Sequence, residues 1–299
     1  MGALIELRIH TLDIGDAHPV RVMGVLNVSP ESFYAGSVRS VPELGRAARL
    51  MIDAGATMLD LGGRSTAPRS AVITVAEELG RVERALQALF GGCELGDTLV
   101  SVDTQHRVVA ERAYELFRAA GKERQFVLND VSCLRTDPTL TAFVAETACP
   151  LILMAAHERP GDSLGVEETL RDLRRGLETL ASAGVDVGSR VIVDPAVGKW
   201  TREKIARYDC EVLRELERFR SLGLPILVAI SRKSFIGEIL GEPDPARRLA
   251  GTQAATAIAV ANGAHIVRTH DVTRETLDTV RVARALCPRA GGGDGLRDS

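Results

Sequence analysis

The sequence contains no apolar run long enough to cross a membrane. Of its 299 residues 45% are apolar, but no stretch approaches the ~20 consecutive apolar residues of a membrane span. The N-terminus also lacks the basic, apolar and small-residue segments of a signal peptide. A formal net charge of −3 gives no electrostatic reason to bind nucleic acid or an anionic membrane. We therefore expect a cytoplasmic protein with no nucleic-acid partner and no membrane partner.

Cysteine is scarce and scattered. The chain has five cysteines, an odd number, and no Cys-x-x-Cys pair. They are Cys93, Cys133, Cys149, Cys210 and Cys287. This pattern favours reduced thiols over a disulfide framework or a zinc site.

Several familiar catalytic and nucleotide-binding motifs are missing. No Gly-x-Gly-x-x-Gly follows the first apolar run, and no second histidine completes a zinc-protease motif around His157. Gly198-Lys199 lacks the remaining residues of a P-loop. No Ser/His or Cys/His pair stands out as an enzymic nucleophile with its base. These absences argue against a dinucleotide-binding fold, a zinc peptidase and a P-loop protein.

Eight short apolar runs recur along the chain, and each ends in a polar residue or a glycine turn. They are 22–26, 57–61, 98–102, 125–128, 150–153, 190–193, 225–230 and 264–267. Buried parallel strands read as continuous apolar runs separated by helical crossovers. A doubly wound open sheet also alternates strands and helices, but eight units favour a single (β/α)8 TIM barrel. In such a barrel the loops after the strands build the active site.

The segments between these runs are predicted helices, and most of them end at a glycine. They are 42–54, 75–90, 106–120, 137–147, 166–183, 202–222, 245–262 and 273–286. Before the first barrel strand, the alternation around Ile5 to Ile9 and a turn at Gly15-Asp16 indicate a β-hairpin covering the barrel floor. We expect residues 1–288 to form one domain, and the polar, glycine-rich tail 289–299 to be disordered.

Polar side chains end strands that are far apart in the sequence. Asp103 and Asp194 end the third and sixth predicted strands, and Asn129 ends the fourth. On a barrel these positions converge at the mouth, where carboxylates can accept paired N–H donors from a ligand edge. The alternative is that the two aspartates only cap the helices that follow them.

Cationic residues follow the last two strands, in segments 231–233 and 268–270. The loops after strands seven and eight often hold a phosphate in these barrels, and Arg and Lys suit an oxyanion. Ion pairs with acids such as Glu238 or Asp271 are the alternative. The first and second loops, 27–33 and 62–68, are polar and glycine-containing, which suits an anion or a hydrated Mg²⁺ but also plain surface loops.

These loops resemble those of the dihydropteroate synthases, folate-pathway enzymes with a pterin-binding TIM barrel. The matching motifs, in order, are LNVSPESF (26–33), SVDT (101–104), ND (129–130), DP (194–195), SRKSFIG (231–237) and RTHD (268–271). The likeness runs from about Val22 to Leu286. It implies condensation of 6-hydroxymethyl-7,8-dihydropterin pyrophosphate with p-aminobenzoate, or a related arylamine, and release of pyrophosphate.

The resemblance also implies roles for individual residues. Those expected to bind the pterin are Asp103, Asn129, Met154, Asp194, Lys233 and Arg268. Those expected at the pyrophosphate and arylamine are Asn27, Thr66, Ser231, Arg268 and His270. The expected catalytic residues are Lys233, Asp103 and Asn27, with Mg²⁺ as cofactor bound through Asn27. The resemblance further implies a homodimer formed through helices late in the barrel.

The second loop departs from the family pattern, which reads Gly-Gly-Glu-Ser-Thr-Arg-Pro-Gly. Here Arg64 replaces the glutamate, Ala67 the arginine and Arg69 the last glycine. Because that arginine normally helps to bind the pyrophosphate and the arylamine carboxylate, Ala67 removes a charged contact. Lys199 stands where the family usually has an aromatic ring, with Trp200 beside it. The pterin half of the site is retained, and the arylamine half is altered.

Two alternatives follow from these observations. One is a pterin-dependent methyltransferase barrel, which would bind methyl-tetrahydrofolate and need no pyrophosphate site. The other is a non-catalytic paralogue that binds pterin without releasing pyrophosphate, as Ala67 suggests.

Overall fold

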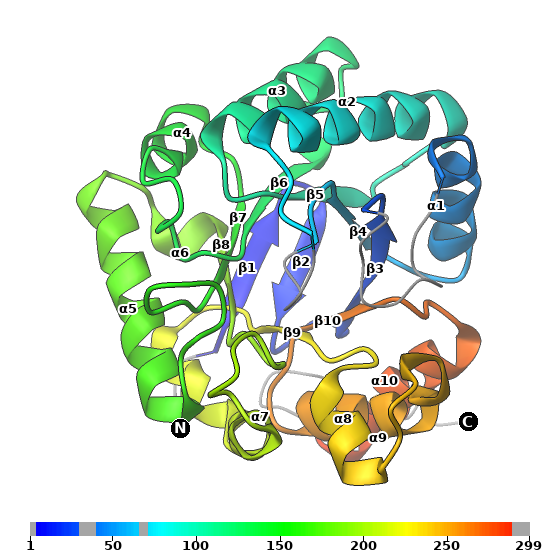
Figure 1. The fold of residues 1–299 in the computed structure, drawn as a ribbon, viewed down its shortest axis with the longest axis vertical. Coiled ribbons are helices and arrows are strands. Elements are labelled where there is room, and N and C mark those ends of the chain that lie inside the picture. The colour runs from blue at the N-terminus through cyan, green and yellow to red at the C-terminus, as the bar shows by residue number, and fades with distance from the viewer. Residues whose placement is uncertain (1–3, 30–39, 66–70, 289–299) are drawn as a thin grey trace.

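The computed structural model describes residues 4–29, 40–65 and 71–288, and within them eight parallel strands surrounded by helices form the core of the fold (Figure 1). The strands are β3 (Arg21–Asn27), β4 (Met58–Gly62), β5 (Leu99–Asp103), β6 (Phe126–Asp130), β7 (Leu151–Met154), β8 (Val191–Asp194), β9 (Leu227–Ala229) and β10 (Ile266–Thr269). Their hydrogen-bonded order is β8-β7-β6-β5-β4-β3-β10-β9. A parallel bridge between Val193 and Ile226 joins the two ends of this sheet. The predicted (β/α)8 barrel is confirmed.

Helices cover the outside of the barrel (Figure 1). They are α1 (Leu44–Asp53), α2 (Val75–Gly92), α3 (Arg107–Ala119), α4 (Leu140–Thr147), α5 (Gly165–Ser182), α6 (Val187–Arg190), α7 (Ala206–Arg214), α8 (Ser234–Leu240), α9 (Leu249–Ala261) and α10 (Arg274–Leu286). Short 3-10 turns are η2 (Val41–Glu43), η3 (Glu123–Gln125), η4 (Leu216–Leu222) and η5 (Pro245–Arg247). In the part of the chain that the structure describes, no helix combines the length and apolar character needed to span a membrane.

The single helix predicted over 202–222 is wrong, because α7 ends at Arg214 and η4 follows it. Leu216 and Phe219 are both fully buried, and residues three apart face the same side of a 3-10 helix. Packing of these two side chains therefore favours the tighter turn. The sequence patterns also gave no sign of the short helix α8 after β9.

The predicted N-terminal hairpin is present and consists of β1 (Glu6–Ile9) and β2 (Leu12–Gly15). Its turn was misplaced at Gly15-Asp16. The chain reverses at His10-Thr11 instead, and His10 adopts a left-handed φ of 53°. Gly15 closes the second strand opposite Glu6, where a Cβ would lie 2.2 Å from the Ile5 carbonyl oxygen. The glycine therefore allows a close strand contact rather than a turn.

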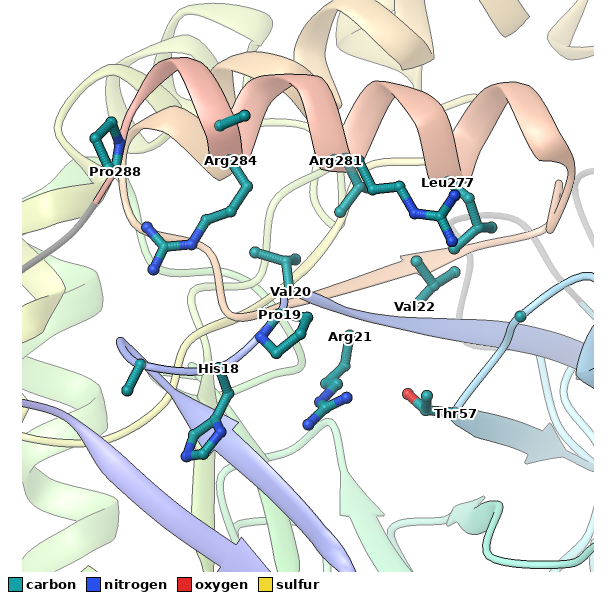
Figure 2. Close-up of a pocket in the computed structure, with 14 residues that line it drawn as sticks. His18, Pro19, Val20, Arg21, Val22, Thr57, Leu277, Arg281, Arg284 and Pro288 are labelled. Carbon is teal, nitrogen blue, oxygen red and sulfur yellow. The ribbon is translucent and has the colours of Figure 1, made fainter. Parts of the chain in front are cut away.

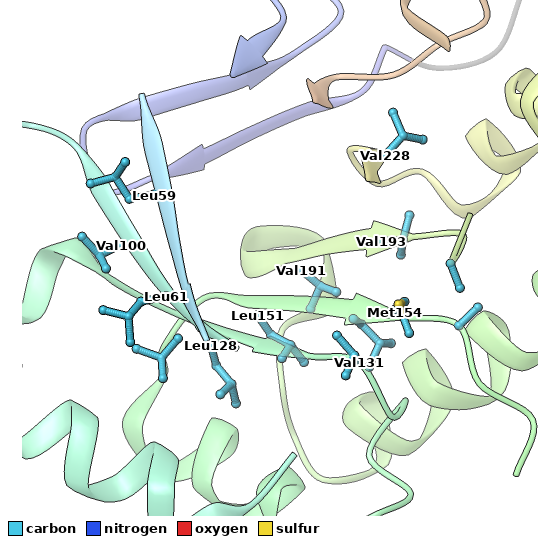
Figure 3. Close-up of a cluster of buried hydrophobic side chains, with 14 of the residues drawn as sticks. Leu59, Leu61, Val100, Leu128, Val131, Leu151, Met154, Val191, Val193 and Val228 are labelled. Atoms are coloured by element: carbon cyan, nitrogen blue, oxygen red, sulfur yellow. The ribbon is translucent and has the colours of Figure 1, made fainter. Parts of the chain in front are cut away.

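Side chains alternate between the two faces of each barrel strand. The outward-facing side chains pack beneath the helices, as Figure 3 shows for residues such as Leu59, Val100 and Val191. One set of inward-facing side chains forms an apolar floor with the hairpin. This barrel floor consists of Met23, Met58, Leu99, Val127, Ile152, Ile192, Leu227 and Ile266, packed against Leu7, Ile9, Leu12 and Ile14. Because the floor closes one end of the barrel, a ligand can enter only from the other end.

The predicted disordered tail, 289–299, lies outside the described residues.

Candidate functional site

A cavity of about 1000 Å³ opens at the carboxyl ends of the barrel strands. Of the residues predicted from the sequence, those that line it are Asn27, Asp103, Asn129, Met154, Asp194, Ser231, Lys233, Arg268 and His270. They come from the ends of seven strands or the loops that follow them. Thr66, Ala67 and Arg69 of the second loop lie outside the described residues. The fold thus brings together side chains separated by more than two hundred positions in the sequence, such as Asn27 and Arg268.

Asp60 is a charged residue at the base of this cavity that the sequence analysis missed. It is fully buried within β4, and its carboxylate accepts hydrogen bonds from Arg268 Nε (2.6 Å), Asn129 Nδ2 (3.1 Å) and the Ser101 hydroxyl. The apolar run 57–61 hid it, because a buried strand was predicted there. The signal was available, since a lone aspartate in a buried strand must face a polar interior.

Asp103 lies beside the same arginine. Its Oδ2 is 3.6 Å from Arg268 Nη2. Burial, and then the nearby Asp60 carboxylate, raise the pKa of Asp103 well above its ordinary value, while Arg268 opposes that shift. A ligand edge that presents N–H donors would stabilise the ionised form of Asp103. The arrangement therefore suits a ligand that donates hydrogen bonds.

Asp194 and Lys233 form the opposite side of the cavity. Asp194 Oδ1 accepts the backbone N–H of Ala196 at 2.8 Å. Burial raises the pKa of Asp194, and the Lys233 ammonium opposes that shift. Lys233 Nζ donates to the Val197 carbonyl and lies 5.0 Å from the centre of the Trp200 ring. Burial lowers the pKa of Lys233 to about 8, although Asp194 partly offsets this effect.

Neither aspartate caps the helix that follows it. The N-cap residue of α3 is His106, and that of α7 is Ile205. Asp103 makes its closest described charge contact with Arg268, across the cavity. The capping alternative is therefore wrong for Asp103 and Asp194.

The cationic segments after β9 and β10 separate into two environments. Arg232 is buried and forms a two-point ion pair with Asp271, with both N···O distances 2.8 Å, so the ion-pair alternative describes this residue. Ser231 and His270 instead line the cavity, with His270 Nδ1 3.0 Å from Ser231 Oγ. The Ser231 hydroxyl also accepts the His270 backbone N–H at 3.2 Å. A hydroxyl and an imidazole are thus held side by side at the mouth.

Arg64, which departs from the family pattern, is anchored to α2. Its Nε lies 2.6 Å from Glu78 Oε2, and its Nη1 donates to the Ile73 carbonyl at 2.8 Å. Glu78 is fully buried and also accepts the Thr104 hydroxyl at 2.5 Å. Glu78 on α2 thus contacts both the loop after β4, through Arg64, and the loop after β5, through Thr104.

Within the described residues, no group of three or more His, Cys, Asp or Glu side chains could hold a metal ion. Asn27 lines the cavity, and its Oδ1 accepts the Ser29 backbone N–H at 3.0 Å. A single amide oxygen fits Mg²⁺ only when water and substrate oxygens provide the other ligands. The side chains described thus suit a magnesium ion that arrives with a phosphorylated substrate.

A second hollow, of about 500 Å³, lies between the start of β3 and α10, at the other end of the barrel (Figure 2). Val20 and Val22 face α10 there, and Arg281 and Arg284 reach from α10 towards the strand. None of the predicted site residues lines this hollow. The chemistry-bearing side chains are therefore gathered at the mouth.

Residues 23–270 match the family described as pterin binding enzyme, and the chain belongs to this family. Among its relatives, a dihydropteroate synthase of Synechocystis sp. is 37% identical over 259 residues, which cover 84% of this chain and 85% of that protein. A dihydropteroate synthase of Escherichia coli is 34% identical over 283 residues, covering 92% and 93%. The structure of Xanthomonas albilineans dihydropteroate synthase with 4-aminobenzoic acid has a TM-score of 0.78 and 32% identity, and the match covers 95% of this chain and 98% of that one. The resemblance seen in the sequence is confirmed.

Proposed function

We propose that this chain is a dihydropteroate synthase, which condenses 6-hydroxymethyl-7,8-dihydropterin pyrophosphate with p-aminobenzoate or a related arylamine. The observation that carries this proposal is the grouping of Asp103, Asn129 and Asp194 with Lys233 in one cavity of a pterin-binding barrel. The named relatives support it over nearly the whole chain. The cavity is large enough for a pterin and an arylamine together, since small-molecule sites measure about 300–1000 Å³.

The pterin would be recognised through its amino and ring N–H groups. Asp103 and Asp194 are acceptors when ionised, and Asn129 offers both an acceptor and a donor. Lys233 would sit over the ring near its carbonyl and N5, and Met154 would pack beside it. Because these groups are buried, each hydrogen bond to a charged partner contributes more than it would in water.

The pyrophosphate would be held by Asn27, His270 and Arg268. Ser231 would lie near the arylamine, and Thr66 of the second loop would serve the pyrophosphate or the arylamine. Asn27 would give one oxygen ligand to Mg²⁺, which supplies positive charge to the departing phosphates when it is bound. The ion pair with Asp60 fixes Arg268 in the cavity, where it would lie between the pterin and the pyrophosphate.

The reaction needs no enzymic nucleophile. The arylamine nitrogen forms a bond to the pterin methylene carbon, and the C–O bond to pyrophosphate breaks with its electron pair leaving on oxygen. The amine then gives a proton to solvent. Stabilising the negative charge on the leaving group and the positive character of the methylene carbon is the task of the site. Arg268, together with the Lys233 ammonium over the ring, would supply positive charge for the first of these, since both line the cavity.

We also propose a homodimer formed through α9 and α10. Large apolar side chains are exposed on these two helices, among them Ile258, Val282 and Leu286. Burying these side chains against a second copy of the chain would favour association. Sedimentation should give a dimer mass, and Val282→Asp should shift it towards the monomer. The cytoplasmic location stays a prediction from the sequence.

The decisive experiment measures pyrophosphate release from dihydropterin pyrophosphate with Mg²⁺ and a panel of arylamines. Release that requires both substrates and is lost in Asp103→Asn supports the proposal. Pterin binding without release from any arylamine would identify a non-catalytic paralogue. Binding of methyl-tetrahydrofolate in preference to the pyrophosphate substrate would identify a methyltransferase.

A further inference from the structure

Charged side chains hold three consecutive residues between β8 and α7 by their backbone groups. Lys204 Nζ donates to the Ala196 carbonyl at 2.6 Å, and Lys233 Nζ donates to the Val197 carbonyl. Asp209 Oδ1 accepts the Gly198 N–H at 2.7 Å. Segment 196–200 continues to Trp200, whose ring lies beneath the Lys233 ammonium. The backbone of this segment is therefore fixed by side chains rather than by a strand or a helix.

Two of these side chains, Lys204 and Asp209, lie outside the cavity lining and are fully buried. Lys204 also donates to the Gly161 carbonyl at 3.2 Å. Asp209 Oδ2 has no hydrogen-bond partner among the described residues. Burial lowers the pKa of Lys204 and raises that of Asp209, and each of the two charges partly offsets the shift of the other. Burying charges in this way costs stability unless they are well paired. Their hydrogen bonds go to the backbone beside the cavity, at Gly161, Ala196 and Gly198, so a contribution to the site would explain their presence.

The segment lies directly against Lys233. Gly198 has a φ of +121°, and a Cβ there would lie 2.5 Å from Lys233 Cδ and 2.9 Å from Nζ. No side chain fits between the segment and the lysine. A small shift of the Gly198 backbone would consequently displace the ammonium group or remove its carbonyl partner.

We propose that Asp209 and Lys204 are positioning residues that hold segment 196–200 in place and thereby fix the Lys233 ammonium in the pterin cavity. The effect of this positioning on turnover rests on the proposed function, whereas the position of the Lys233 ammonium does not. Asp209 and Lys204 touch neither the cavity nor a substrate, and they act through the backbone of Ala196 and Gly198.

The charges around Lys233 give a second readout, one that reports whether Asp209 and Lys204 face the ammonium and does not depend on turnover. The groups that face it are Asp194 on β8, Arg268 on β10, Asp209 on α7 and Lys204 before α7. Asp194 and Asp209 raise the pKa of Lys233, while Arg268 and Lys204 lower it. Removing the charge of Asp209 should lower this pKa, and removing that of Lys204 should raise it.

The first test compares Asp209→Leu with Asp209→Asn in the pyrophosphate-release assay. Leucine removes the acceptor for the Gly198 N–H, and we expect kcat to fall about 10–100-fold with a smaller change in KM. Asparagine can still accept this hydrogen bond, and we expect it to keep kcat within about threefold of the original chain. Asp172→Asn is the matched control. Asp172, on α5, is about as buried as Asp209, but its carboxylate contacts Ser163 and His157 in the loop before α5.

The second test is independent of activity. The chain has only four lysines, so ¹³C labelling at lysine Cε gives four NMR signals that can be titrated separately. Lys233 should titrate near 8, lower in Asp209→Asn and higher in Lys204→Met, with Asp172→Asn unchanged. A Lys233 titration that is the same in all four proteins would overturn the proposal, as would an Asp209→Leu chain with unaltered kcat. If the chain released no pyrophosphate at all, the proposed function would fail. The titrations would still test whether Asp209 and Lys204 hold segment 196–200 against Lys233.

Discussion

The floor and the mouth of the barrel are built from the same strands, two residues apart. The inward-facing floor positions carry eight apolar side chains, from Met23 round to Ile266. Two positions further along the same strands are Val25, Asp60, Ser101, Asn129, Met154, Asp194, Ala229 and Arg268. Because successive side chains of a strand point to opposite faces, residues two apart both point into the barrel. The first set packs with the hairpin into an apolar floor, whereas the second includes charged and amide side chains that line the cavity, namely Asn129, Asp194 and Arg268.

This comparison separates stability from chemistry. Floor side chains such as Leu99 are fully removed from water, and each contributes about 1.5–3 kcal/mol to folding. In the mouth, Asp60 is a fully buried charge and Lys233 is a partly buried one, and the desolvation of both works against folding. Substitutions in the floor should therefore lower stability and spare catalysis, and substitutions in the mouth should do the reverse.

The largest expected effect is on catalysis, from Asp103→Asn in the mouth. The amide keeps the size of the carboxylate but presents an NH₂ group that cannot accept an N–H from the pterin. We expect kcat/KM to fall about 10²–10³-fold, or about 3–4 kcal/mol, with little change in melting temperature. Pyrophosphate release and a thermal melt on the same sample provide the check. Turnover within a factor of three of the original chain would remove Asp103 from the proposed site.

Next in size is the effect of Leu99→Ala in the floor. Leu99 is fully buried against the hairpin, and its truncation leaves a cavity that the rigid barrel cannot fill. We expect the free energy of unfolding to fall by about 3 kcal/mol, as for other buried Leu→Ala changes. The kcat/KM of the folded protein should stay within a factor of two. If activity fell as much as stability, the floor and the mouth would not be independent.

An ion pair beside the floor, between buried Asp16 and partly exposed Arg220, sharpens the comparison. Asp16, after β2, accepts Arg220 Nη1 at 2.7 Å and Nη2 at 2.8 Å. Although burial raises the pKa of Asp16, hydrogen bonds from Arg220 and His265 hold it well below its ordinary value. Since Arg220 is partly exposed, we expect Arg220→Gln to cost about 2 kcal/mol, less than a fully buried pair.

The sign of the pH dependence follows from this lowered pKa. The stabilisation of the folded protein by ionised Asp16 is complete above the pKa of Asp in the unfolded chain, about 4. It is lost as the pH falls towards the lower pKa of Asp16 in the folded protein. Denaturant unfolding at pH 7 and pH 3 should show the gap between Arg220→Gln and the original chain narrowing in acid. A gap that is equal at both pH values would mean that Asp16 is not held ionised by Arg220.

The fold could be predicted from the sequence because buried parallel strands consist of short apolar runs, and polar residues follow most of them. The same rule placed Asp103, Asn129 and Asp194 at the mouth. It failed for Asp60, because the rule considers only the polar residues that end a strand, and Asp60 lies within one. It also failed for Arg232, because adjacent residues in one loop can face opposite ways, and only three-dimensional packing directs Arg232 to Asp271.

Segment 196–200 shows a further limit of the sequence. The spacing of Lys204 and Asp209 carries no recognised pattern, and they approach Ala196 and Gly198 only after the chain has turned back on itself before α7. Similarly, the replacement of a loop carboxylate by Glu78 depends on where α2 packs. Local rules predict which element a residue belongs to, whereas tertiary contacts decide which groups it meets.

The smallest predicted effect is a pH dependence of kcat/KM that arises from a residue of the mouth and is unaffected by changes in the floor. Burial lowers the pKa of Lys233 to about 8, so the ammonium form dominates below pH 8 and is lost above it. If the protonated lysine stabilises the departing charge, kcat/KM should fall tenfold per pH unit above this value, about 1.4 kcal/mol at pH 9. The profile is measured by pyrophosphate release from pH 6 to 9.5, and Leu99→Ala, which touches only the floor, should reproduce it. A profile that stays flat to pH 9.5 would show that the charge on Lys233 is not required, and the leaving group would then depend on Arg268, whose raised pKa keeps it charged throughout this range.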